Sequence, residues 1–79
     1  MKKLSELSLD KTAKIIGFSN KLNLEFINDI MDHGLIIGSS ITVLGNLSDK
    51  IILNLGYSNI SIRKKDAEQI FIDNMENYE

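Results

Sequence analysis

The 79-residue sequence contains no cysteine, no proline and no tryptophan. The absence of cysteine excludes disulfide bridges, thiolate metal or iron–sulfur sites and a cysteine nucleophile. Long apolar stretches are missing too: the longest uninterrupted runs, such as Leu35–Ile37 and Ile51–Leu53, hold three residues, whereas a membrane span needs roughly 18. A domain of this size without covalent or metal cross-links must be held together by its aliphatic core.

Charge of neither sign dominates, because the net charge is -2 and the isoelectric point is near 5.3. A nucleic-acid-binding domain would present a basic face, so we expect no nucleic acid as a partner. Lys2 and Lys3 precede the segment Leu4–Asp10, which polar residues interrupt too often for the core of a signal peptide. We therefore expect a cytoplasmic protein with no segment inserted into the membrane.

Aliphatic residues and phenylalanine make up what the sequence has in quantity. Isoleucine, leucine, valine and phenylalanine account for 27 of the 79 residues, well above the proportion of roughly 20% that is typical of disordered chains. The length allows one domain, which we place at residues 1–73. Residues 74–79 are acidic and polar and are expected to fray.

One segment has the apolar spacing of an amphipathic helix, and we place that helix at Leu24–His33. Asn23 is suited to cap its N-terminus, because the side-chain oxygen can accept a bond from an unpaired amide of the first turn. Gly34 is suited to the left-handed position after the helix. There it would allow Ile30 and Leu35 to meet as in a Schellman motif.

The remaining apolar segments alternate with a period of two, which is typical of β-strands. Gly17 lies where a bulge is expected, and the residues before Thr12 form a lead-in with one helical turn. A second short helical turn, with Asp66 as its cap, precedes the last strand. The expected strands are Thr12–Ser19, Ser40–Leu47, Ile51–Leu55, Ile60–Arg63 and Ile70–Asp73.

This order predicts a mainly β fold with one inserted α-helix. Short strands and tight turns in a small chain favour a highly twisted β-barrel whose closure removes the exposed edges. We expect the helix to plug an open end of that barrel.

Asp29, Asp32 and His33 are the candidate metal ligands, because three- and four-residue spacings bring them to one side of a helix. The alternative is a solvated helix face on which the dipole favours a charged His33 near the C-terminus. We adopt the solvated face and expect neither a bound metal nor a cofactor. Catalysis is not expected either, because His33 is the only histidine and no glycine-rich phosphate motif is present.

Two further residues are candidates for contact with a partner. Tyr57 is expected at a turn, where an exposed aromatic ring can anchor an interface. Arg63 begins the only basic cluster, Arg63–Lys65. The alternatives are an uninvolved turn residue and a solvated charge that Asp66 and Glu68 partly neutralise. Asp29, His33, Tyr57 and Arg63 are our candidate partner-binding residues.

Two segments resemble the ferrous iron transport protein A (FeoA) family. The run Ile30–Gly38, followed by a strand, is similar to the joint between helix and strand in that family. The run Gly56–Ile72 looks like its closing signature of glycine, an alternating strand, arginine, an acidic–alanine pair and isoleucine. The sequence departs from the family pattern at Ile37, where proline is common, and it lacks the usual helical arginine.

The resemblance implies a small SH3-like β-barrel that works as a protein-interaction module in bacterial ferrous iron uptake. The implied partner is the membrane transporter FeoB, whose activity the module would modulate. Because the same domain occurs fused to metal-dependent repressors, a metal-responsive sensor is an alternative function. A self-associating structural module is another, and we expect a monomer or a weak homo-oligomer.

Overall fold

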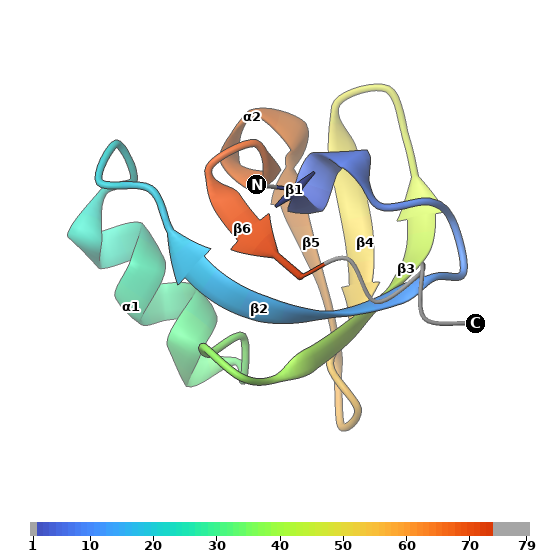
Figure 1. Cartoon of the computed structure of the whole chain (residues 1–79), viewed down its shortest axis with the longest axis horizontal. Coiled ribbons are helices and arrows are strands. Elements are labelled where there is room, and N and C mark those ends of the chain that lie inside the picture. Colours follow the sequence, from blue (N-terminus) through green and yellow to red (C-terminus); the bar gives the residue numbers. More distant parts are fainter. Residues whose placement is uncertain (1, 74–79) are drawn as a thin grey trace.

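A computed structural model describes residues 2–73, and the predicted frayed tail at residues 74–79 lies outside them. Six antiparallel strands form one sheet in the order β1-β6-β2-β3-β4-β5. One main helix, α1, and two short helical segments complete the fold (Figure 1). The elements are β1 (Lys2–Lys3), the 3₁₀ helix η1 (Leu4–Glu6), β2 (Thr12–Phe18), α1 (Leu24–Asp32), β3 (Ser40–Asn46), β4 (Lys50–Asn54), β5 (Asn59–Arg63), α2 (Lys64–Ala67) and β6 (Ile70–Ile72).

Strand β2 joins the two halves of the sheet. Its first residues, from Thr12 to Lys14, pair with β3, and its later residues, from Ile15 to Phe18, pair with β6. The register shifts between Ile15 and Gly17, which confirms the bulge predicted at this glycine. Because a bulge increases the local twist and bends the strand, β2 can serve both halves (Figure 1).

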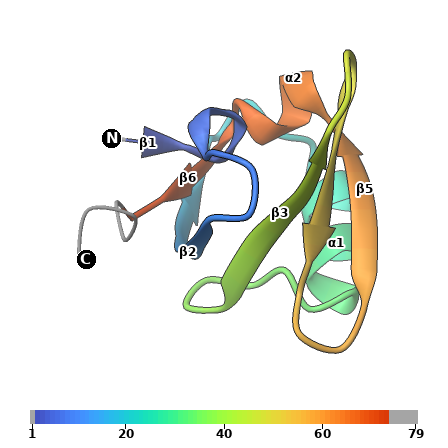
Figure 2. The same ribbon diagram turned by 90° about the vertical axis from the view of Figure 1, so that its right-hand side faces the viewer.

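The sheet is not closed, so the prediction that closure removes the edges is wrong. Within residues 2–73, β1 and β5 each pair with one neighbour only, and they form the two edges. Helix α1 lies next to β5 (Figure 2). The pairing of short strands is decided by tertiary packing, which local sequence patterns do not report.

Both predicted capping motifs of α1 are confirmed, although the helix stops at Asp32 rather than His33. The side chain of Asn23 accepts a hydrogen bond from the Glu25 amide at 2.7 Å. At the other end the Leu35 amide donates to the Ile30 carbonyl and the Gly34 amide donates to the Met31 carbonyl, both at 3.0 Å. These are the two bonds of a Schellman motif, and Gly34 has the positive φ of 102° that the motif requires.

The core lies between the two halves of the sheet and consists of aliphatic side chains. No polar or charged residue among those described is buried. The strands supply most of the core through alternate positions, as their period of two predicts. Its largest fully buried side chains are Leu4, Ile15, Leu35, Ile41, Val43, Ile51, Leu53, Ile70 and Ile72.

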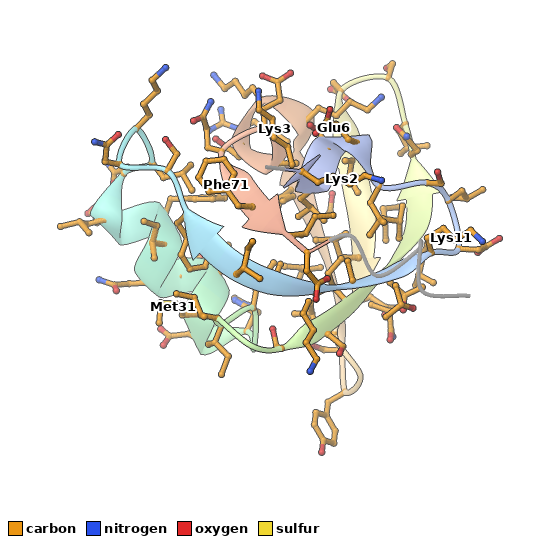
Figure 3. The ribbon with its side chains drawn as sticks, viewed as in Figure 1. Lys2, Lys3, Glu6, Lys11, Met31 and Phe71 are labelled. Carbon is orange, nitrogen blue, oxygen red and sulfur yellow. The ribbon has the colours of Figure 1, made fainter. Side chains whose placement is uncertain are left out.

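Two local expectations need correction. The lead-in contains its predicted helical turn, but Lys2 and Lys3 also form a strand that pairs with β6. The Lys3 amide then donates to the Glu6 carboxylate at 2.7 Å (Figure 3). Asp66 does not cap α2, because it lies inside the helix and pairs with Arg63 instead.

Removal of the helix cap offers a direct test of this description. Asn23→Ala is expected to lower the free energy of unfolding by about 1 kcal/mol, because the Glu25 amide loses its acceptor. Urea denaturation of the purified protein measures the change. Asn28→Ala is the matched control, since Asn28 is exposed within α1 and alanine favours helix. An equal loss in both variants would show that the cap does not stabilise α1.

Candidate functional site

A groove of about 330 Å³ runs between α1 and the edge strand β5. It exists because α1 follows β2 and returns beside an edge to which no further strand of residues 2–73 is added. Helix α1 contributes Phe26, Asp29 and Ile30, its C-cap residue His33 completes that wall, and the strand contributes the run from Asn59 to Ile62.

The groove has an apolar base and a polar rim. Ile30 and Ile62 are buried, and Phe26 and Ile60 pack against the core while they remain partly accessible. The base therefore offers apolar surface to a ligand without being a closed cavity.

Asp29 and His33 form the rim of this groove on α1, and both are exposed. His33 Nδ1 donates a hydrogen bond to the backbone carbonyl of Asp29 at 2.8 Å. The imidazole is therefore held against its own helix, while the Asp29 carboxylate is left available to a ligand.

A second hollow, of about 410 Å³, continues this surface toward the other end of β5. Phe26 lines both hollows and so joins them. Arg63, Lys21 and Lys65 bring positive charge to the second one, together with Asp66 and Glu68. Arg63 Nε donates to Asp66 Oδ2 at 3.0 Å, so part of that charge is neutralised locally.

The structure places three of the four candidate partner-binding residues along this surface. Asp29 and His33 lie on the rim of the first hollow, and Arg63 lines the second. Tyr57 is fully exposed in the turn between β4 and β5, outside both linings. Asp32 is exposed and also lies outside the groove.

The three candidate metal ligands are not assembled into a site. Within residues 2–73, no three histidine, cysteine, aspartate or glutamate side chains are grouped so that they could hold a metal ion. His33 Nδ1 is already engaged with the helix backbone. Among the described residues the geometry offers an open surface groove rather than a coordination centre.

The sequence did not reveal that Phe26, Ile60 and Ile62 take part in a groove. Their apolar character predicts the core, and each does pack on or in it. Their additional role arises because α1 lies beside the edge of the sheet. The only signal that could have indicated this role is the position of their alternating strand at the edge of the sheet. Strand order is not visible in a single sequence, so that position could not be predicted.

No helix within residues 2–73 has the length and the apolar content that a bilayer crossing requires.

Comparison with known protein families assigns the chain to one of them. The FeoA domain family matches residues 2–74, which is nearly the whole sequence. The chain belongs to the FeoA domain family. No curated protein matches it. The resemblance seen in Ile30–Gly38 and Gly56–Ile72 is thereby confirmed, and the family is associated with ferrous iron transport.

Solved structures support the same assignment. The FeoA protein from Chlorobium tepidum has a TM-score of 0.83 and 27% identity, over 90% of this chain and 68% of its own. The FeoA-like protein from Clostridium acetobutylicum has a TM-score of 0.73 and 29% identity, over 92% of this chain and 88% of its own.

A third structure shows the fold class. FeoA of Stenotrophomonas maltophilia, solved with zinc and described as an SH3 domain protein, has a TM-score of 0.78 over 92% of this chain and 91% of its own. At 17% identity this likeness concerns the fold alone. The predicted fold class, mainly β and SH3-like with one inserted helix, is confirmed for this FeoA domain, with the open sheet as its correction.

Proposed function

We propose that this FeoA domain is a non-catalytic accessory module of bacterial ferrous iron uptake, which contacts and modulates a FeoB-type membrane transporter from the cytoplasm. Membership of the FeoA family over residues 2–74 is the observation that carries the proposal. The S. maltophilia relative is described as a candidate activating factor of ferrous iron transport.

The surface between α1 and β5 is suited to such contacts. It combines an apolar base with charged groups at both ends, as protein-binding surfaces commonly do. Asp29, His33 and Arg63 would meet the partner there, and Tyr57 would add an exposed aromatic anchor at the neighbouring hairpin. Modulation would follow from binding itself, without chemistry in the groove.

Capture of the transporter tests this function. The tagged, folded domain is expected to retain a FeoB-type transporter from detergent-solubilised membranes of its own source. Tyr57→Ala is expected to weaken capture by about tenfold, which is the usual effect of losing an aromatic anchor. Its thermal midpoint should stay unchanged, because the ring is fully exposed.

Lys14→Ala provides the matched control. Lys14 is an exposed residue of β2, away from both hollows. The control should retain the transporter as well as the original protein does. Failure of the original protein to retain the transporter, both in iron-replete and in iron-depleted cells, would contradict the proposed function.

A further inference from the structure

Strand β5 is an edge strand of the sheet within residues 2–73, and its residues 59–62 line the groove. The Leu55 amide donates to the Ser58 carbonyl at 2.8 Å, and the Lys64 amide donates to the Asp49 carbonyl at 2.9 Å. In the antiparallel register that these bonds share, Ile60 and Ile62 direct their amides and carbonyls toward β4.

The intervening residues must therefore direct their backbone groups away from β4. Ser61 is the central one and Arg63 is the last, and β5 pairs with no strand other than β4 within residues 2–73. These outward amides and carbonyls are a template on which another extended chain can pair.

This edge lacks several of the features by which proteins usually block such pairing, although Arg63 gives it one charge and α1 lies beside it across the groove. Proline, lysine and bulges are common protections of an edge strand, yet β5 reads Asn-Ile-Ser-Ile-Arg and its register with β4 is unbroken. The opposite edge, β1, is only two residues long. The edge that is competent for pairing is thus the one that borders the groove.

The length of the groove and the direction of its two walls also suit an added strand. The five residues of β5 extend about 14 Å at the usual rise of about 3.4 Å, and the nine residues of α1 cover a similar distance. The N-terminal end of α1 lies by Arg63 and its C-terminal end by Asn59, so the helix runs antiparallel to β5.

The charge of α1 indicates which kind of ligand the groove would favour. Between Leu24 and Asp32 the helix carries three carboxylates and no lysine or arginine. Its C-terminal end adds the negative pole of the dipole beside the Asn59 end of the groove. A basic side chain on the occupant would therefore be attracted to Asp29 on the rim.

We propose that the groove between α1 and β5 binds an extended peptide segment of a partner protein, which adds to β5 as a further strand. Alternate apolar side chains of that segment would lie on Phe26 and Ile60, and a basic side chain would face Asp29. The proposal deepens the function proposed above, because it assigns the mode of binding and the chemical class of the segment.

Two substitutions at Ser61 distinguish the contribution of the β5 backbone amide to peptide binding from the contribution of the side chain. Ser61→Pro removes the outward amide hydrogen and also restricts φ to about −65°, and proline is tolerated in an edge strand when that amide faces away from the neighbour. Ser61→Ala changes the side chain and keeps the amide, so it is the matched control. Circular dichroism and the thermal midpoint check that both variants fold.

The probe is a synthetic peptide of about ten residues that alternates valine and threonine around a central lysine, titrated into the full chain and followed by NMR. Binding is expected to slow hydrogen exchange at the Ser61 and Arg63 amides while Ile60 and Ile62 change little. Ser61→Pro should bind several-fold to about tenfold more weakly than Ser61→Ala, because a backbone hydrogen bond is lost. A peptide N-methylated on the amides that face β5 should not bind.

A separate experiment tests whether Asp29 attracts a basic side chain of the peptide. Asp29→Asn should lower the affinity for the lysine peptide several-fold and leave the affinity for a glutamate version unchanged or raised. Equal effects on both peptides would overturn the assignment of a basic segment.

Other results would overturn the proposal as a whole. Equal affinities of the Ser61→Pro and Ser61→Ala variants would exclude strand addition. Dimerisation in sedimentation experiments that Ser61→Pro abolishes, without peptide binding, would make a second copy the occupant. Transporter capture that is insensitive to Ser61→Pro would leave the proposed function standing and this inference refuted. Peptide binding that Ser61→Pro weakens, in a protein that does not capture the transporter, would support strand addition and contradict the proposed function.

Discussion

Leu53→Ala is expected to lower the free energy of unfolding by about 2–5 kcal/mol, the usual result of truncating a buried leucine. Leu53 is fully buried in β4, where it pairs with Val43 of β3 and with Ile60 of β5. A domain of this length is stabilised by only about 4–12 kcal/mol. The variant is therefore expected to lose a large part of its stability or to be unfolded at 37 °C.

Urea denaturation followed by circular dichroism measures this loss. Leu24→Ala is the matched control, because the same atoms are removed from a side chain that is 75% exposed at the start of α1. It should change the stability by less than about 0.5 kcal/mol. Similar losses in the two variants would mean that the core does not have the composition described here.

Local signals allowed the sequence to predict α1 well. The Asn23 cap and the Schellman motif at Gly34 involve residues two to five positions apart, so the information lies within a short segment. The alternating strands were also predicted to within one or two residues. Their alternation reflects one buried face, and this face is visible without knowledge of the partner strand.

Strand order was not predictable in the same way. Lys2 and Lys3 show no strand pattern, and they become a strand only because β6 offers Phe71 and Ile72 as partners. Closure was expected because exposed edges are a liability in general. The open edge of β5 results from how far the sheet extends and from where α1 lies, and neither is encoded in a local repeat.

The candidate site, too, was predictable only where it depends on local spacing in the sequence. Helical spacing placed Asp29 and His33 near each other, and the structure adds that both border one groove. That β5 forms the other wall depends on contacts between residues about thirty positions apart in the sequence. The sequence therefore indicated candidate residues, whereas the surface that joins three of them required the tertiary structure.

The end of α1 depends on backbone conformation, and Gly34→Val is expected to destabilise the protein by about 1–3 kcal/mol. Gly34 has a φ of 102°, which a β-branched residue rarely adopts. Steric overlap at Cβ is not the cause, because the nearest atom, Leu55 Cδ1, would lie 3.9 Å away. The expected loss therefore comes from backbone strain and from the two bonds of the Schellman motif.

Comparison of two substitutions at this position separates strain from bulk. Gly34→Asn should retain more of the stability than Gly34→Val, because asparagine is enriched at positive φ. Chemical denaturation gives the free energies, and the amide NMR signals of Gly34 and Leu35 report whether the bonds to Met31 and Ile30 persist. Equal losses for valine and asparagine would show that side-chain bulk against Leu55, rather than φ, limits this position. The rim residue His33 lies directly before this glycine, so the left-handed conformation of Gly34 also determines where α1 ends beside β5.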